Sequence, residues 1–105
     1  MTQKKLDTIV VENDAVMIYF SGEDCGVCKV LQPQIRKLLD EKYPKIVQYY
    51  IEASDSRELC GSLSIFAVPT LIIYFDGKEF IRKSRNFSAL ELDKDLSRPY
   101  SLFFD

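Results

Sequence analysis

The uninterrupted apolar run AVMIYF at residues 15–20 constrains the fold of this chain more than any other feature of its sequence. Polar residues precede the run at Asn13-Asp14 and follow it at Ser21-Gly22. A short apolar run bounded in this way is typical of a β-strand that is covered on both faces. Covering both faces of a sheet requires helices above and below it, so the run predicts an α/β fold.

Hydrophobic spacing and capping residues predict where the other elements lie. Helices are expected over residues 5–12, 25–43, 54–63 and 88–96. Strands are expected over residues 15–20, 46–51, 71–75 and 79–82, the last one half-exposed and the others buried. Pro33 is expected to kink the second helix, Pro44 to stop it, and Pro99 to end the last helix. The Asp76-Gly77 pair predicts a hairpin turn between the last two strands.

The order of these elements is α-β-α-β-α-β-β-α. It predicts two parallel crossovers followed by an antiparallel hairpin, which together form a mixed four-stranded sheet with helices on both faces. The chain has 105 residues, of which 47% are hydrophobic. That length and composition suit one hydrophobic core, so residues 1–105 are expected to form a single domain.

The composition excludes several classes of function. Histidine is absent, which excludes Ser-His-Asp hydrolases, Cys-His proteases and histidine-ligated zinc sites. Fourteen basic residues against sixteen acidic ones give a net charge of −2, which argues against nucleic acid or an anionic membrane as a partner. The polar start MTQKKLD and the lack of a long apolar stretch predict a soluble, cytoplasmic protein.

The chemistry of the chain is concentrated in the motif CGVC at residues 25–28, between a predicted strand and a predicted helix. This spacing brings two sulfurs within disulfide reach across the first helical turn, and the helix N-terminus stabilises a thiolate on the first sulfur. We therefore expect Cys25 to be the nucleophile, and the more buried Cys28 to be the resolving cysteine. Lys29 favours the Cys25 thiolate, whereas the like charges of Glu23 and Asp24 oppose it.

Other interpretations of the three cysteines remain open. The pair could be two inert packed thiols. A zinc site would need two further ligands, and Cys60 is the one remaining sulfur in a chain without histidine, so no metal and no organic cofactor are expected. Cys60 itself is expected to be a buried packing thiol, with a regulatory or dimer-forming role as the alternative.

The chain resembles the thioredoxin superfamily over nearly its whole length. The matching residues are Phe20, the stretch Cys25-Gly26-x-Cys28-Lys29, Pro33, Val68-Pro69-Thr70 with the apolar strand after it, and Asp76-Gly77. The resemblance implies a thioredoxin fold and a cis Val68–Pro69 bond facing the cysteine pair, at a docking edge for extended substrates. It implies substrate contacts by Val68, Pro69, Thr70, Gly26 and Val27. The implied function is a protein disulfide reductase that maintains cell redox homeostasis and receives electrons from a thioredoxin-reductase-like or other dithiol protein.

The chain departs from the usual pattern of this family at several positions. Asp24 and Val27 stand where thioredoxins carry tryptophan and proline, and Tyr19 and Tyr50 replace a buried acid and its lysine companion. Arg85 stands at the position of a glycine in the substrate groove, and no leading strand precedes the first helix. We expect Tyr19, Asp24 and Lys29 to tune the redox chemistry. The departures predict a more specialised and less reducing enzyme than a housekeeping thioredoxin.

Two other functions stay open on the sequence: a disulfide oxidase or isomerase, and a binding or adaptor module that keeps the fold with little reductase activity. The apolar end of the chain, residues 100–105, is expected to fold back over the sheet or the last helix, with an association patch as the alternative. The basic run at residues 82–85 is expected to be a solvated hairpin edge, although in a changed groove it could select acidic partners.

Overall fold

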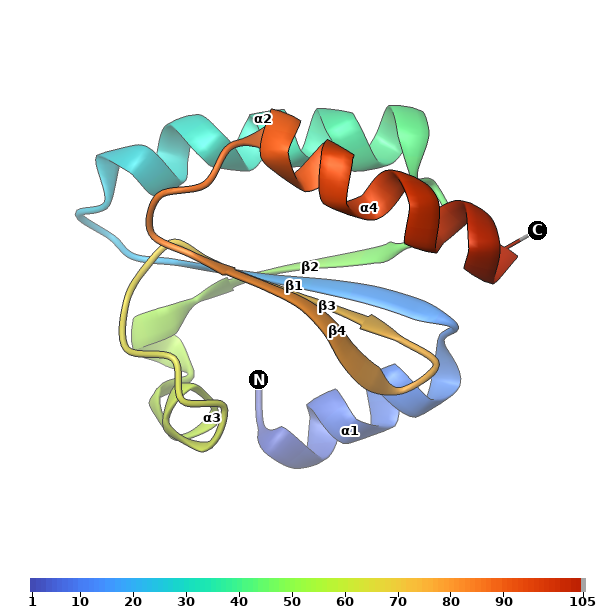
Figure 1. Ribbon diagram of the computed structural model, residues 1–105. Coiled ribbons are helices and arrows are strands. Elements are labelled where there is room, and N and C mark those ends of the chain that lie inside the picture. The colour runs from blue at the N-terminus through green and yellow to red at the C-terminus, as the bar shows by residue number, and fades with distance from the viewer. Residues whose placement is uncertain (105) are drawn as a thin grey trace.

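The apolar run forms a central strand, β1 (Ala15–Ser21), in a computed structural model that describes residues 1–104 (Figure 1). The other strands are β2 (Val47–Glu52), β3 (Thr70–Phe75) and β4 (Lys78–Ser84). The helices are α1 (Gln3–Glu12), α2 (Gly26–Lys42), α3 (Arg57–Ser62) and α4 (Ala89–Phe104), with a short 3-10 turn η1 (Ala53–Asp55) before α3. Each predicted element is present, and Pro33 lies inside α2 as expected.

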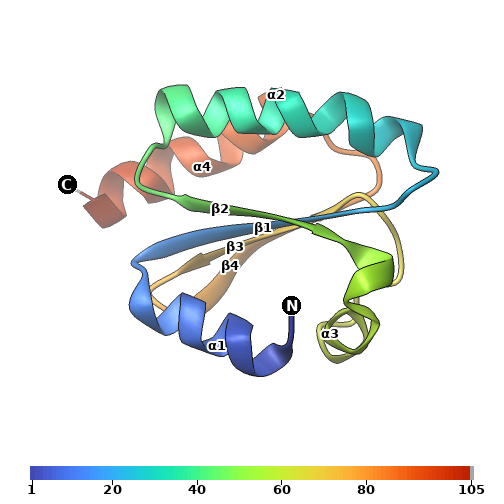
Figure 2. The same cartoon turned by 180° about the vertical axis from the view of Figure 1, so that it is seen from behind.

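Two apolar layers hold the helices to the sheet. Helices α2 and α4 cover one face, and α1 and α3 cover the other, as both views show (Figures 1 and 2). Successive side chains of β1 divide between the layers, so that Met17 and Tyr19 pack under α2 and α4 while Ile18 and Phe20 pack on α1 and α3. Because every one of these side chains enters a core, the strand is buried from Ala15 to Phe20, and the predicted α/β fold is confirmed.

The sheet has the strand order β2-β1-β3-β4, and its strand directions correct one prediction. β1 and β2 are parallel, but β3 is antiparallel to β1, so the chain makes one parallel crossover and not two. The connection between β2 and β3, residues 53–69, begins and ends at the same edge of the sheet, where Glu52 pairs with Ser21 and Thr70 pairs with Phe20. β3 therefore runs back along β1 in the opposite direction.

The strand predicted over residues 46–51 is present as β2, but the prediction that it is buried is wrong. β2 lies at an edge of the sheet, where Val47 is exposed and the residues from Gln48 to Glu52 are half-buried. An edge strand has a neighbouring strand on one side only, so its side chains are covered less completely than those of a central strand. The order of the strands in the sheet places β2 at the edge, and the local apolar pattern of residues 46–51 does not predict that order.

Helix α4 does not end before Pro99 but continues to Phe104, with Pro99 inside it. Aromatic contacts of the last turns explain the difference. Tyr100 packs edge-on against Tyr43 at 4.9 Å between ring centroids, and Phe103 packs against Phe75 at 5.2 Å. Burying an aromatic side chain contributes about 1.5–3 kcal/mol, which offsets the roughly 3 kcal/mol cost of proline inside a helix. The expected covering of the sheet by this segment is confirmed up to Phe104, and Asp105 lies outside the described residues.

The hairpin between β3 and β4 has the predicted turn. Asp76 and Gly77 have φ values of 53° and 78°, which suit a two-residue turn with both central residues in the left-handed region. The register between the two strands shifts after Ile73, where Phe80 is the extra residue of β4. Among the helices of residues 1–104, none has both the length and the apolar character that crossing a bilayer requires.

Candidate active site

Three loops meet at one end of the sheet, and they hold most of the predicted site residues. They connect β1 to α2, α3 to β3, and β4 to α4, and both views place them together at the end opposite the β3–β4 hairpin (Figures 1 and 2). The backbone N–H of Arg85 in the third loop donates to the carbonyl of Pro69 in the second, at 2.8 Å. The site is therefore assembled from segments that are about 60 residues apart in the chain.

The cysteine pair lies where the first of these loops meets α2. Cys25 is the N-cap of the helix, and the backbone N–H of Cys28 donates to its Sγ at 3.1 Å. The two sulfurs form a disulfide with a Cα–Cα distance of 5.2 Å. Cys25 is half-buried and Cys28 is fully buried, which confirms the predicted order of exposure. When the bond is reduced, the Cys28 amide and the other free amides of the first turn would stabilise a thiolate on Cys25.

Charged neighbours of the pair lie on the surface. Asp24 precedes the pair and Lys29 follows it, and both side chains are exposed. Neither side chain forms an ion pair or hydrogen bond with another described residue of the chain. Their charges act on Cys25 through solvent, where screening weakens them.

Tyr19 lies under the pair from the centre of β1. Its hydroxyl donates to the carbonyl of Cys28 at 3.0 Å, and the side chain is fully buried. Burial, with a smaller contribution from Tyr50, raises the pKa of Tyr19 to about 12. The phenol is therefore protonated at neutral pH, so it cannot accept a proton from a cysteine thiol. Its contact is with the helix backbone and not with either sulfur.

The second loop contains the expected cis bond between Val68 and Pro69. Pro69 and Thr70 are buried, and the Thr70 hydroxyl donates to the carbonyl of Ala67 at 2.6 Å, so this side chain supports the loop from inside. Val68 lies against the first loop: a Cβ added to Gly22 would be 3.1 Å from Val68 Cγ2 and 3.8 Å from Cys25 Cβ. The structure thus brings Val68 and Cys25 close together beside Gly22.

Two open grooves are lined by residues of this region, one by residues between the two cysteines and the other by Val68. One, of about 660 Å³, is lined by residues of α2 and of the loop before α4: Gly26, Val27, Val30, Leu31, Gln34, Phe87 and Ser88. The other, of about 410 Å³, is lined by residues of η1, α3 and the loop before β3: Ala53, Ser54, Arg57, Cys60, Gly61, Ile65, Phe66, Ala67 and Val68. Val27 is 59% exposed and Phe66 is 84% exposed, so each groove presents a large apolar side chain to solvent.

Cys60 is buried as predicted, and it is a free thiol. Burial raises its pKa, and its Sγ lies 3.8 Å from the carbonyl of Ala53. Sequence reasoning did not single out Glu52, whose Oε1 is buried without a hydrogen-bond partner in the described structure. Glu52 pairs with Ser21 at the carboxyl ends of β2 and β1, the edge from which the chain leads to Cys25. Residues 1–104 contain no cluster of three metal-ligating side chains.

Comparison with known proteins gives the family. The family model for thioredoxin matches residues 1–98. The thioredoxin-like protein YdfQ of Bacillus subtilis is 35% identical over 98 residues, which are 93% of this chain and 87% of that protein. Thioredoxin-1 of Saccharomyces cerevisiae is 28% identical over 78 residues, covering 74% of this chain and 75% of that one. The solved structure of oxidised mitochondrial thioredoxin 3 from the same yeast matches with a TM-score of 0.81 at 23% identity, over 92% of this chain and 90% of that one.

The comparisons agree with the geometry. The sheet order and its covering helices match the solved thioredoxin, which confirms the predicted thioredoxin fold. The match at the level of sequence spans the cysteine pair and the cis-proline loop. A disulfide-bonded pair at a helix N-terminus is the arrangement that thiol–disulfide exchange requires. The chain therefore belongs to the thioredoxin family and is a thiol-disulfide oxidoreductase.

Proposed function

We propose that this oxidoreductase reduces disulfides in other proteins, with Cys25 as the nucleophile and Cys28 as the resolving cysteine. The observation that carries the proposal is the hydrogen bond from the Cys28 amide to Cys25 Sγ at the start of α2. It favours the thiolate on the half-buried sulfur, which is the one that a substrate can reach.

The proposed cycle transfers two electrons to the substrate. The Cys25 thiolate attacks one sulfur of the substrate disulfide, the substrate S–S bond breaks, and the departing substrate thiolate takes up a proton. The Cys28 thiol then loses its proton and attacks Cys25 Sγ, which releases the second substrate thiol and leaves the Cys25–Cys28 disulfide. A dithiol protein, such as a thioredoxin-reductase-like partner, reduces that disulfide again and closes the cycle.

The substrate is proposed to bind in extended form along Val68, Pro69 and Thr70, with further contacts to Gly26 and Val27. The exposure of Val27 and the contact between Val68 and the Cys25 loop support this docking edge. Buried Thr70 contributes its backbone rather than its side chain. Asp24 and Lys29 are proposed to tune the redox potential by charge, and Tyr19 by positioning the Cys28 carbonyl.

The wider role is also part of the proposal. We infer that residues 1–105 act as one domain in the cytoplasm, that the working group is the cysteine pair without a further cofactor, and that the enzyme contributes to cell redox homeostasis. The replacement of the proline between the cysteines by Val27 favours a less reducing potential than that of ordinary thioredoxins. A redox titration against glutathione tests this point, and a potential equal to theirs would contradict it.

Reduction of insulin disulfides in the presence of dithiothreitol tests the main proposal. Turnover by the wild type, lost in Cys25→Ser and in Cys28→Ser, is the expected result. In addition, Cys28→Ser should accumulate mixed disulfides on Cys25, because the resolving thiol is missing. A Cys25–Cys28 pair that cycles with dithiothreitol but reduces no protein substrate would instead favour the adaptor function. Refolding of scrambled ribonuclease without net reduction would favour an isomerase.

A further inference from the structure

We infer that Arg85 is a specificity-determining residue, which favours substrate disulfides with an acidic residue near the reacting cysteine. This inference rests on the proposed reduction of protein disulfides and names the class of substrate. It is carried by the position of Arg85, its backbone conformation, and the absence of an acidic partner for its side chain within residues 1–104.

The position of Arg85 is fixed next to the docking edge. Its N–H donates to the carbonyl of Pro69, and the residue before it, Ser84, pairs with Thr70 in the sheet. The Ser84 hydroxyl also lies 3.1 Å from the Thr70 hydroxyl. Because the backbone is held on both sides of this point, the side chain of Arg85 must leave the fold beside the segment that a substrate would contact.

The backbone at Arg85 is in a conformation that favours glycine. Its φ is 63°, in the left-handed region, which a residue with a Cβ adopts uncommonly and at some cost; Ser64, just after α3, is there as well, at 58°. Asp76, which also has a positive φ, lies in a hairpin turn that favours aspartate. Arg85 has no such local reason, and strained residues of this kind concentrate at functional sites.

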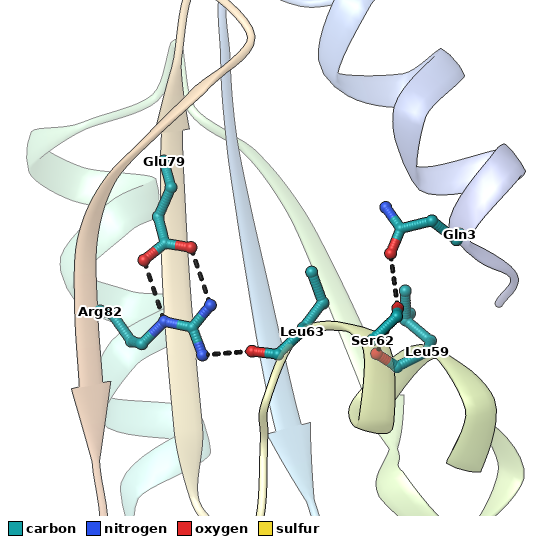
Figure 3. A network of polar contacts seen from close by, with 6 residues as sticks. All are labelled: Gln3, Leu59, Ser62, Leu63, Glu79 and Arg82. Atoms are coloured by element: carbon teal, nitrogen blue, oxygen red, sulfur yellow. Dashed lines mark hydrogen bonds and ion pairs between the residues drawn. The ribbon is translucent and has the colours of Figure 1, made fainter.

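The charge of Arg85 has no ion-pair partner within residues 1–104, in contrast to the basic residues that precede it in β4. Arg82 makes two hydrogen bonds to the Glu79 carboxylate and one to the carbonyl of Leu63, which ties β4 to the loop after α3 (Figure 3). Lys83 forms ion pairs with Glu91 and Asp95. The exposed guanidinium of Arg85, by comparison, meets no acid among the described residues. Arg82 and Lys83 are therefore held by partners within the protein, which the prediction of a solvated hairpin edge did not include, whereas exposed Arg85 is available to a partner.

Other charges at this end of the molecule define where the acidic residue would bind. Arg57 lines the groove beside Val68 and is likewise exposed and unpaired within the described chain. Glu23 and Asp24 are exposed next to Cys25 and would repel an acid on their side. An acidic side chain is thus favoured where the substrate passes Pro69, and disfavoured where it passes the start of α2.

Single-turnover reduction of peptide disulfides tests the inference. The substrates are disulfide dimers of an eight-residue peptide with Glu, Lys or Ala two positions before or two positions after its cysteine. Pre-reduced enzyme is mixed with each dimer, quenched with acid and analysed by chromatography. In one of the two positions, the Glu peptide should react about three- to fivefold faster than the Lys peptide at low salt, as expected for an exposed ion pair. The ratio should approach one in about 1 M NaCl, where the Debye length is near 3 Å.

Variants separate a role in specificity from a purely structural one. Arg85→Glu should reverse the Glu-to-Lys ratio, Arg85→Lys should keep it, and Arg85→Gly should abolish it while raising thermal stability. Lys78→Glu changes the charge by the same amount at the far end of β4, so it must leave the ratio unchanged. A ratio near one in the wild type, or the same ratio in Arg85→Glu, would overturn the inference while leaving disulfide reduction intact. If none of the peptides is reduced, the proposed function itself fails.

Discussion

Replacing Tyr19 by phenylalanine removes one oxygen from the buried site and tests what this side chain does. The hydroxyl donates to the Cys28 carbonyl at 3.0 Å, and the ring, which is fully buried, lies 5.8 Å from the ring of Tyr50. Phenylalanine keeps the ring and its packing. A buried hydrogen bond contributes about 0.5–1.5 kcal/mol net, and the Cys28 carbonyl keeps its place in the helical hydrogen-bond pattern. The expected loss in the free energy of unfolding is therefore about 1 kcal/mol.

Thermal and urea denaturation of the oxidised protein, followed by circular dichroism, measures this loss. For a chain of this size, about 1 kcal/mol corresponds to a fall in Tm of roughly 4–8 °C. Tyr50→Phe is the matched control: its hydroxyl bonds the Gln48 side chain at 2.6 Å on a half-buried edge strand, so a smaller effect is expected.

The same variant tests the chemistry of the pair. Since the pKa of Tyr19 is about 12, the phenol stays neutral at pH 7 and bonds the backbone rather than a sulfur. The midpoint of the pH profile of Cys25 alkylation in the reduced protein should therefore move by less than about 0.3 pH units in Tyr19→Phe. Unchanged stability together with a shift of one unit or more would refute this reasoning, because it would place the hydroxyl on the sulfurs.

Three further predictions follow from the same structure. Burial raises the pKa of Tyr19 above its unfolded value of about 10, so its stabilising contribution is complete below pH 10 and is lost as the pH rises toward 12. In that range the contribution of Tyr19 to the free energy of unfolding should decrease by up to about 1.4 kcal/mol per pH unit. Urea midpoints should fall accordingly, and less steeply in Tyr19→Phe. Gly22→Ala crowds the cis-proline loop, so it should lower the free energy of unfolding by about 1 kcal/mol and slow insulin reduction. The Cβ of Gly61→Ala meets no described atom within 4 Å, so this variant should raise the free energy of unfolding by about 0.5–1 kcal/mol in thermal melts. Equal effects of the two variants would contradict the contact between Gly22 and Val68. Phe104→Ala should destabilise the protein by about 1.5–3 kcal/mol, because its ring packs against Phe75 and Tyr100. The side chain of Leu102 is 69% exposed, so Leu102→Ala should cost less than about 0.5 kcal/mol. Similar urea midpoints for the two variants would argue against the packing of the last turns on the sheet.

Much of the site was predictable from the sequence because it depends on neighbours in the chain. The cysteine spacing, the strand before it and the helix after it together place Cys25 at a helix N-terminus, and no distant residue is needed for that. The Asp76-Gly77 turn is determined in the same way, since two adjacent residues set its backbone angles. The cis bond before Pro69 was expected from the resemblance to a family, not from its local sequence.

Contacts between distant segments decided the rest. The pairing of Arg85 with Pro69, and the difference between paired Lys83 and unpaired Arg85, depend on where α4 and β3 lie beside β4. The position of Tyr19 under the Cys28 carbonyl likewise depends on how α2 crosses the sheet. Contacts of this kind leave no periodic pattern in the sequence. The residue types and charges of Tyr19, Lys83 and Arg85 therefore could not predict which groups these side chains contact.

The sequence by itself determined which segments are helices and strands, the location of the redox pair, and the order of exposure of its two cysteines. These features follow from local hydrophobic spacing, capping and turn residues, which act within a few positions of the chain. Only the tertiary structure decided that β3 runs antiparallel to β1, that β2 is a half-exposed edge, and that α4 continues through Pro99. Each of those outcomes is set by packing between segments far apart in the sequence, whose burial outweighs the local preference.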